Sequence, residues 1–400
     1  MTAPLLEGLT VLDFTRVLAG PYCTRLLADL GARVIKIERP LHGDDTRAFY
    51  LQLEEGRTDQ SSYFVRFNAG KESVAIDLAN PEARPVVFDL VRKSDVLIEN
   101  FVPGVMARHG FDYAAVAAVN PAIVYCSISG YGQTGPLRDR PAFAHLINAA
   151  SGAMDLDRQG DPAPRVAYLQ SADSLAGVHA FGLVLAAVNR RQRTGQGANL
   201  DVSMLQSLWG AEDIGIAAGL NGGEITKGPR PGMIIHPVKG QQIAVQFIGG
   251  GPTWDRLLAF MGAESAIGAV KFATPQGRRD HWPELRTLIC EWLDHFDSAE
   301  AAMKALTAAR VPCAPVRSME EVIAHPHMEE RGAFSNIPHP ARGEVRVTSA
   351  PFLIDGASVP ARGPAPYRAG EHTRAVLTET LGYSAEQIDA LLASGAIAVP

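Results

Sequence analysis

Near the N-terminus, apolar and polar residues alternate in a way that predicts a strand, a helix and a second strand. The run Leu9 to Phe14 is apolar and is followed by Gly20-Pro21, where a proline fits the first turn of a helix. We expect that helix to stop at Gly31, and the β-branched run Val34 to Ile37 to form a buried strand. A β-α-β unit of this kind places ligands beyond the carboxyl ends of its strands.

The loop after the first predicted strand lacks the glycine pattern that binds dinucleotides. A dinucleotide site requires G-x-G-x-x-G here, and the chain has only Ala19-Gly20-Pro21. The sequence therefore argues against an NAD-dependent dehydrogenase. We expect the loop from Arg16 to Tyr22 and the charged strand end Glu38-Arg39 to face some other ligand.

Strand-like and helix-like stretches continue to alternate through the first half of the chain, as in a parallel α/β sheet. The stretch from Asp173 to Arg193 is apolar nearly all round, so we predict a buried helix that ends at Gly195 and Gly197. Further strands are predicted over 73–77, 96–99, 123–128 and 199–203, and a further helix over 81–93.

Breaker residues mark a change of organisation in the second half. Asn221-Gly-Gly223 and the segment 227–232 predict a domain border, followed by a smaller α+β domain over about 225–325. We expect the Pro- and Gly-rich segment 331–366 to wrap over other structure rather than form a core. Within this half we predict a strand over 241–247 and helices over 252–262, 282–296, 298–309 and 384–394.

Composition narrows the classes of partner. The chain has 400 residues, with 37 Lys and Arg against 43 Asp and Glu, so no general basic charge attracts nucleic acid or a membrane surface. The four cysteines are far apart and form no C-x-x-C motif, which is typical of reduced thiols in a cytoplasmic protein. No segment reaches about 18 uninterrupted apolar residues. His325 and His327, with a proline between them, favour an exposed turn, so we predict no metal site.

Asp173 is the residue best suited to chemistry, because it stands where the long apolar helix is predicted to begin. At a helix N-cap or first turn, free backbone N–H groups and the helix dipole keep a carboxylate ionised. An ionised carboxylate suits a nucleophile. Aspartate is also a common capping residue, so a purely structural role fits the same position.

Several cations lie at predicted strand ends or in loops, where they could meet phosphate groups. Arginine presents a fork of donors and lysine a mobile point charge, although a solvated surface position is the usual fate of either. The glycine-rich loop Ser129 to Pro136 allows close backbone approach but lacks the Gly-Lys-Ser/Thr of a Walker loop. The cations in question are Arg39, Lys71, Arg108, Arg138 and Arg140.

A set of ordered motifs spread over nearly the whole chain resembles those of the class III CoA-transferases. Together these motifs are far more specific than any one alone. They are Leu6 to Asp13, Val17 to Pro40, Gly43-Asp44, Asn68 to Lys71, Glu99 to Gly104, Ser129 to Pro136, Arg193 to Gly197, Val311 to Val316, His325 to His327 and Gly370 to Thr373.

The resemblance implies an architecture and a set of substrates. It implies a Rossmann-like large domain built from residues 1–224 and 326–400, a small domain over 225–325, and a homodimer of two interlocked subunits. CoA and acyl-CoA would be substrates rather than tightly bound cofactors, and a small carboxylic acid would be the other substrate.

In that family one aspartate is the nucleophile, and Asp173 matches it. By similarity, its carboxylate attacks the acyl-CoA thioester to give a mixed anhydride, the CoA thiolate then forms an aspartyl-CoA thioester, and an acceptor carboxylate completes the exchange. The resemblance implies CoA contacts at Arg39, Lys71, Asn100, Arg108 and Arg138, and a substrate pocket at Arg16, Leu18, Ala19, Phe143 and His145.

Departures from the family pattern concern the substrate. Leu18 stands where the formyl-CoA:oxalate enzymes carry glutamine, and their polyglycine loop is reduced to Asn221-Gly-Gly223, which argues against oxalate. The related α-methylacyl-CoA racemases carry a catalytic histidine and aspartate where this chain has Phe143 and Ala144. Because His145 is adjacent, an isomerase remains an alternative, as does a CoA-binding protein without catalysis.

Overall fold

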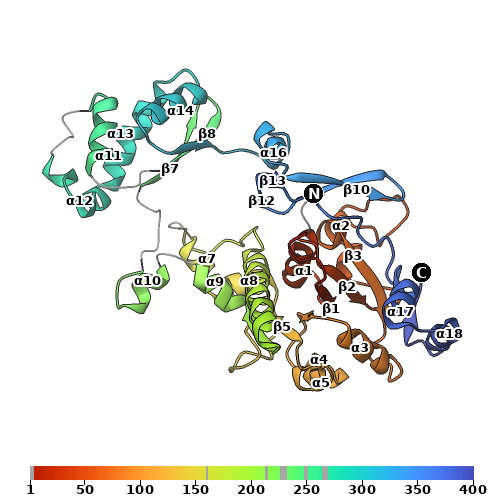
Figure 1. Cartoon of the computed structure of the whole chain (residues 1–400). Coiled ribbons are helices and arrows are strands. Elements are labelled where there is room, and N and C mark those ends of the chain that lie inside the picture. The colour runs from red at the N-terminus through yellow and green to blue at the C-terminus, as the bar shows by residue number, and fades with distance from the viewer. Residues whose placement is uncertain (1–3, 159–160, 212–214, 226–231, 247–250, 264–268) are drawn as a thin grey trace. The chain divides into compact units, whose positions relative to one another are not determined.

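The structure is a computed structural model that describes residues 4–158, 161–211, 215–225, 232–246, 251–263 and 269–400. Residue contacts divide the chain into two compact units (Figure 1), which are described separately here. The first unit comprises residues 1–155, 165–225 and 326–400, and the second comprises 156–164 and 226–325. Most of the breaker-rich segment 227–232 lies outside the described residues.

A seven-stranded sheet forms the centre of the first unit, in the order β14-β3-β2-β1-β4-β5-β6. Every neighbouring pair is parallel except β14 with β3, which confirms the predicted α/β class. The strands are β1 (Thr10–Asp13), β2 (Arg33–Glu38), β3 (Lys71–Ile76), β4 (Val96–Glu99), β5 (Val124–Ser129), β6 (Ala198–Ser203) and β14 (Ile397–Ala398).

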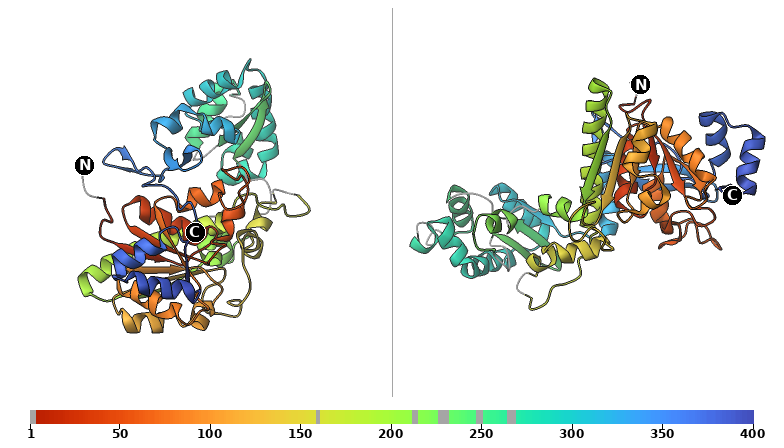
Figure 2. Two further views of the ribbon diagram at one scale, coloured as in Figure 1. Left: turned by 90° about the vertical axis from the view of Figure 1, so that its right-hand side faces the viewer. Right: turned by 90° about the horizontal axis from the view of Figure 1, so that it is seen from below.

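Helices cover both faces of this sheet (Figure 2), which explains why its strands are short apolar runs. Val11 and Ile98 face one core with α1 (Ala19–Asp29) and α8 (Ser171–Thr194). Leu12 and Leu97 face the opposite core. That second core includes α3 (Ala83–Arg92), α17 (Thr373–Leu381) and α18 (Ala385–Ala393).

Short elements complete the first unit, and several of them follow the carboxyl ends of strands. They are η1 (Asp45–Ala48), α2 (Ser62–Asn68), α4 (Val105–His109), α5 (Tyr113–Val119), α6 (Ala144–Ala150), α7 (Ala153–Leu156), α9 (Met204–Ala211), α10 (Gly215–Leu220) and α16 (Pro326–Glu330).

The segment 331–366 differs from the prediction, because it contains an antiparallel hairpin of β10 (Phe334–His339) and β11 (Gly343–Thr348). Val345 and Val347 are buried and alternate with exposed charged residues, a strand pattern hidden among the prolines and glycines. They pack with Ile337 and with α2, so the segment contributes a small core. A second short hairpin pairs β12 (Leu353–Ile354) with β13 (Ala357–Ser358).

The prediction that α8 is buried is correct for one face only. Ala176, Ala180 and Val184 are fully buried, whereas Val178 and Leu183 are exposed. By length and composition, α8 is the one helix in the described part of the chain that could cross a membrane. Its buried face packs against α1, which accounts for much of that apolar composition within the fold.

The second unit has a three-stranded antiparallel sheet of β7 (Met233–Val238), β8 (Gln241–Gln246) and β9 (Cys313–Pro315). Helices pack on it around Trp254, Trp282 and Leu293. The helical elements of this unit are α11 (Gly251–Phe260), η3 (Val270–Phe272), α12 (Pro275–Asp280), α13 (Trp282–Asp294) and α14 (Ala299–Ala308), and α15 (Met319–Ile323) follows β9 without a buried residue.

A buried ion pair ties the centre of the large sheet together. Lys71, at the start of β3, places its Nζ 3.1 Å from Asp13 Oδ2 at the end of β1. The same Nζ donates to Thr24 Oγ1 at 2.8 Å and to Asn68 Oδ1 at 2.9 Å. Burial lowers the pKa of Lys71 to about 8, against the opposing effect of Asp13. The hydrogen-bonding capacity of the Lys71 ammonium is therefore satisfied by groups within the protein.

We predict that Lys71→Met destabilises the protein by about 3–5 kcal/mol, because it leaves the Asp13 carboxylate buried without its partner. Urea unfolding monitored by circular dichroism measures the change. Arg39→Met is the matched control, since Arg39 is half-exposed and its loss is expected to cost less than about 1 kcal/mol. Equal losses for the two variants would contradict the prediction.

Candidate functional site

The loop from Thr15 to Val17, after β1, is held by side chains that bond its backbone. Asp13 Oδ1 accepts the Thr15 N–H at 2.8 Å, and Lys36 Nζ donates to the Thr15 carbonyl at 2.6 Å. Asn100 accepts the Arg16 N–H at 2.8 Å and donates to the Arg16 carbonyl at 2.7 Å. These bonds fix where α1 begins.

Asp173 lies in the first turn of α8, and the backbone N–H groups of Ala19 and Ala144 lie close enough to lower the pKa of its carboxyl group. Ala19 is the first residue of α1 and Ala144 the first of α6, so three helix starts surround one carboxylate. Each start supplies free N–H groups and the positive end of a helix dipole.

Burial raises the pKa of Asp173 to about 6, although the two N–H donors and nearby His145 act in the opposite direction. The sequence predicts a carboxylate held ionised by its helix start. Here burial outweighs that effect, so the charged form predominates only above about pH 6.

The close approach of α1 and α8 depends on Gly177. A Cβ atom at this position would lie 2.6 Å from the Ala19 carbonyl oxygen. A larger residue would therefore push the two helices apart. Asp173 lies one turn before Gly177 on α8, so this glycine also keeps the Ala19 N–H near enough to lower the pKa of Asp173.

Asp173 lines a cavity of about 300 Å³ at the carboxyl edge of the sheet. Most of the wall is apolar, with Arg16 and Arg140 as the cations. Ser129 is only 5% exposed, and its Oγ has no hydrogen-bond partner among the described residues. The other lining residues are Val17, Ala19, Asp45, Asn100, Phe101, Val102, Pro103, Val105, Ile128, Gly130, Ala142, Phe143 and Met204.

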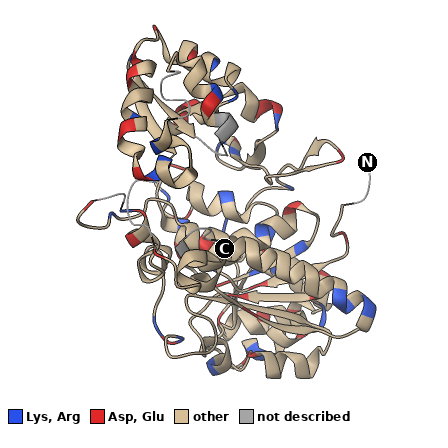
Figure 3. Ribbon diagram, turned by 90° about the vertical axis from the view of Figure 1, so that its left-hand side faces the viewer, with Lys and Arg blue, Asp and Glu red and all other residues tan. Residues whose placement is uncertain are grey.

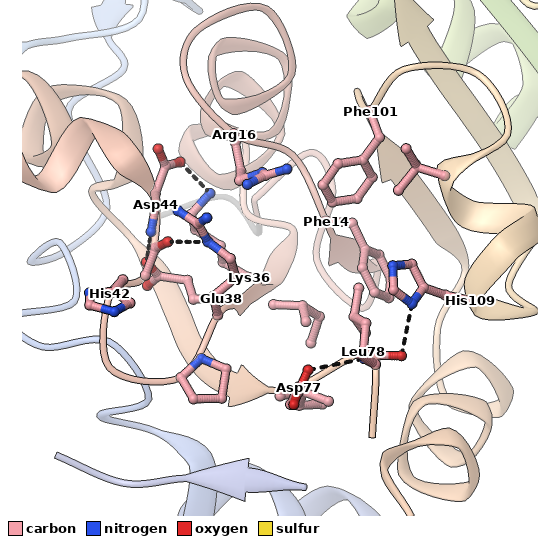
Figure 4. Close-up of a pocket in the computed structure, with 17 residues that line it drawn as sticks. Phe14, Arg16, Lys36, Glu38, His42, Asp44, Asp77, Leu78, Phe101 and His109 are labelled. Atoms are coloured by element: carbon pink, nitrogen blue, oxygen red, sulfur yellow. Dashed lines mark hydrogen bonds and ion pairs between the residues drawn. The ribbon is translucent and has the colours of Figure 1, made fainter. Parts of the chain in front are cut away.

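A second cavity, of about 380 Å³, lies beyond the ends of β1, β2 and β3. Arg16, Phe101 and Val105 line both cavities. The Arg16 guanidinium is 4.7 Å from the centre of the Phe101 ring, and Figure 4 shows the two side chains next to each other at one end of the larger cavity. The cavities therefore adjoin at this stacked pair.

The five predicted CoA contacts fall in different places. Arg39 lines the larger cavity and pairs with Asp45. Arg108 is exposed and Arg138 pairs with Asp139, and neither lines either of the two cavities. Charges of both signs are interspersed along the ribbon in Figure 3, so a phosphate must be met by local cations.

The side chains of Lys71 and Asn100 form hydrogen bonds to other groups of the protein, which argues against the predicted contacts to CoA. Lys71 is 3% exposed and its ammonium is surrounded by protein oxygens. Asn100 does line the cavity beside Asp173, but its amide bonds the backbone of Arg16. The sequence places these residues at strand ends but does not show which group their side chains meet.

Three of the predicted substrate-pocket residues, Arg16, Ala19 and Phe143, line the cavity of Asp173. Leu18 is buried and does not line it. His145 lies close enough for its charge to affect the pKa of Asp173, and its buried Nδ1 has no hydrogen-bond partner in the described part of the chain.

The prediction omits Ser129, Phe101 and Val105 as individual wall residues. Phe101 and Val105 follow β4, and Ser129 ends β5. Their shared signal is position, because residues at the carboxyl ends of parallel strands gather at one edge of the sheet.

A family profile described as CoA-transferase family III matches residues 6–373. Among curated proteins, a formyl-CoA:oxalate CoA-transferase from Rhodopseudomonas palustris is 31% identical, with 99% of this chain and 98% of the relative covered. A succinate–glutarate CoA-transferase from Agrobacterium fabrum is also 31% identical, with 94% and 96% covered.

Solved structures share the fold over nearly the full length. A CAIB/BAIF family protein from Brucella suis superposes with a TM-score of 0.80 at 29% identity, with 94% of this chain and 100% of that chain covered. Rv3272 from Mycobacterium tuberculosis superposes with a TM-score of 0.82 at 26% identity, with 93% and 99% covered.

Proposed function

The chain belongs to CoA-transferase family III, and from this membership we propose that it moves CoA from an acyl-CoA to a carboxylic acid through a covalent intermediate on Asp173. The observation that carries the proposal is the placement of the Asp173 carboxylate. It lines a largely apolar cavity, and backbone N–H groups at the starts of two other helices lower its pKa.

In the proposed reaction, an Asp173 oxygen attacks the thioester carbon and CoA leaves as a thiolate, which gives a mixed anhydride. The thiolate then attacks the Asp173 carbonyl carbon, so an aspartyl-CoA thioester forms and the donor acid leaves. The acceptor carboxylate attacks that thioester, CoA leaves again, and a second mixed anhydride forms. Attack of the thiolate on the acceptor carbonyl yields the new acyl-CoA and restores Asp173.

The backbone N–H groups of Ala19 and Ala144 have a role in two of these steps. When the thiolate or the acceptor attacks the Asp173 carbonyl carbon, negative charge develops on the Asp173 oxygen. Donors already aimed at that oxygen stabilise the tetrahedral intermediate without reorganisation. The apolar wall keeps water away from the anhydride and thioester, which would otherwise hydrolyse.

We assign the larger cavity to the nucleotide end of CoA and the smaller one to the thioester. Arg39 lines the larger cavity as a cation for a phosphate, and Phe14, Ile37 and Phe101 supply apolar surface for a base. The CoA arm would pass the Arg16–Phe101 pair, which borders both cavities. No tightly bound cofactor enters this scheme.

We further propose that the acceptor has a second acidic group, which Arg140 and Ser129 bind. The Arg140 side chain lines the cavity of Asp173 and has no ion-pair partner in the part of the chain that the structure describes. The Ser129 Oγ is buried there without a partner. The acids named for the two curated relatives are dicarboxylic, and a second carboxylate would bond both side chains.

The exposed face of α8 supports the homodimer that family resemblance implies. Val178, Gly182, Leu183 and Ala186 are exposed on this helix. We propose that a second copy of the chain covers them, because an apolar helix face of this length gains free energy from burial.

We expect Asp173 to be trapped as a hydroxamate when the protein is incubated with succinyl-CoA, glutaryl-CoA or formyl-CoA and hydroxylamine. Hydroxylamine captures an aspartyl anhydride or thioester, and peptide mass spectrometry locates the adduct. Asp173→Asn should lose both the adduct and at least about a thousandfold of the transfer rate, as expected when a covalent nucleophile is removed.

Asp139→Asn is the control for that experiment, because Asp139 is exposed and lies outside both cavities. It should keep the adduct at Asp173. Full transfer activity in Asp173→Asn would contradict the proposal. Deuterium uptake at the acyl α-carbon from heavy water, with no adduct, would instead favour the isomerase suggested by His145.

We expect Arg140→Gln to raise the KM for succinate by roughly tenfold or more, because it removes a charged hydrogen-bond donor to the second carboxylate. The measurement is initial transfer rate against succinate concentration at saturating acyl-CoA, repeated with propionate. Arg138→Gln, two residues away and outside the cavity, should leave the KM unchanged. Equal effects of the two variants, or an equal effect on propionate, would count against a second carboxylate at Arg140.

Light scattering is expected to give about twice the chain mass of 42.8 kDa at micromolar concentration. Leu183→Glu should lower the dimer fraction or the melting temperature, because it places a charge in the proposed interface. A wild-type mass of one chain throughout the concentration range would refute the dimer.

A further inference from the structure

Val17 adopts a backbone conformation that its side chain disfavours. Its φ is +70°, in the left-handed region that glycine enters freely and that a β-branched residue rarely occupies. Such strain persists only where surrounding bonds impose it. Val17 lies two residues before Ala19, which lines the same cavity as Asp173 and whose backbone N–H lowers the pKa of that carboxyl group.

Asn100 bonds the backbone directly before Val17, and the Val17 N–H itself donates to Asp44 Oδ1 at 3.4 Å. The Asn100 side-chain oxygen accepts the Arg16 N–H at 2.8 Å, and its side-chain nitrogen donates to the Arg16 carbonyl at 2.7 Å. The Asn100 amide thus bonds both the N–H and the carbonyl group of Arg16, the residue immediately before Val17. Asn100 directly follows β4, where the Phe101 N–H bonds Glu99 Oε2 at 2.9 Å.

These two hydrogen bonds from Asn100 influence where α1 begins. Past Val17, Leu18 accepts the Tyr22 N–H at 2.8 Å in the first turn of α1. If Val17 relaxed to a negative φ, the chain direction at Leu18 would change and Ala19 would turn away from its present place. The N–H of Ala19 would then no longer be aimed at the Asp173 carboxylate.

We propose that Asn100 is a positioning residue, which holds Val17 in its strained conformation so that the Ala19 N–H stays aimed at Asp173. This role rests on the proposed function of Asp173. It differs from the CoA contact that family resemblance implies for the same residue, because both halves of the amide are bonded to protein backbone. Asparagine suits the role since it carries one acceptor and one donor group in a fixed plane.

Asn100→Ala tests the proposal, with Asn120→Ala as the matched control. Asn120 is also half-buried and also bonds backbone, donating to the carbonyls of Val91 and Ser94, but it precedes β5 at the opposite edge of the sheet. We expect Asn100→Ala to slow single-turnover formation of the Asp173 hydroxamate by roughly tenfold to a hundredfold. We expect Asn120→Ala to slow it less than about twofold, and calorimetry to find CoA affinity unchanged in both variants.

Val17→Gly supplies the rescue. Glycine is unstrained at positive φ, so it removes the reason for the loop to relax when Asn100 is truncated. In the Asn100→Ala background, Val17→Gly should restore the rate by about threefold or more, whereas in the wild-type background it should give no gain. Equal factors in the two backgrounds would overturn the proposal, because they would show that the two residues act independently.

Crystal structures of the variants test the geometry without any activity. Asn100→Ala should show Val17 at negative φ and the Ala19 N–H turned away from the Asp173 carboxylate. An unchanged loop, or a CoA affinity at least tenfold weaker with Val17 still at positive φ, would overturn the positioning role. In a further outcome, the wild-type protein forms no adduct while the loop still relaxes in the Asn100→Ala crystal structure. That result would contradict the proposed function but would support the role of Asn100 in holding Val17.

Discussion

The carboxylate of Asp13 is the constraint on which the site depends. It is completely buried, and burial alone would raise its pKa, but the charges of Lys71 and Lys36 and its hydrogen bonds bring that pKa down to about 2. One oxygen accepts the Thr15 N–H in the loop, and the other accepts the Thr24 hydroxyl on α1 at 2.7 Å. A single anion therefore fixes both sides of the turn that leads from β1 into α1.

The comparison of Asp13 with Asp173 shows why one aspartate is structural and the other is suited to chemistry. Asp13 is enclosed by lysine ammonium groups and hydroxyl donors, which keep it charged and fully bonded. Asp173 forms no ion pair with a lysine or arginine among the described residues, and burial raises its pKa to about 6 against the smaller lowering effects of nearby backbone N–H groups and His145. A carboxylate that is neither neutralised by a salt bridge nor freely hydrated keeps more of its reactivity, provided that its donors stay in place.

Those donors belong to backbone, so their direction is set by the loops before α1 and α6 rather than by any side chain of their own. In the loop before α1, Asp13 and Lys36 bond the backbone of Thr15, and Asn100 bonds the backbone of Arg16. The large sheet therefore acts on the site through the few side chains at the carboxyl ends of β1, β2 and β4. The rigid sheet positions the reacting groups, whereas the side chains of the cavity wall can vary with the acid that is bound. Such an arrangement suits a transferase.

Much of the fold follows from local patterns. Apolar runs bounded by glycine and proline located β1, β2 and β4 within a residue or two, and Gly195 ended α8 as expected. The exposed face of α8 was not predicted, because the sequence of an apolar helix does not show whether its own chain or a second chain buries each face. The hairpin of β10 and β11 was missed because its strands lie in a segment rich in proline and glycine, which favours turns.

For the site, the sequence indicated Asp173 and the loop after β1 but not the partners of individual side chains. Lys71 and Asn100 have the chemistry of ligand contacts and stand at strand ends, as a binding residue would. Only the three-dimensional structure shows that their polar groups are bonded to Asp13 and to the Arg16 backbone. Long-range pairs of this kind carry no local signal, since the partners are more than 50 residues apart.

The most direct test of this account is a crystal structure of the Asp173→Asn protein with succinyl-CoA bound. We expect the adenine in the cavity lined by Phe14, Ile37 and Arg39, and the thioester carbon about 3–3.5 Å from the side chain at position 173. A CoA whose thioester lies outside the cavity of Asp173 would contradict it.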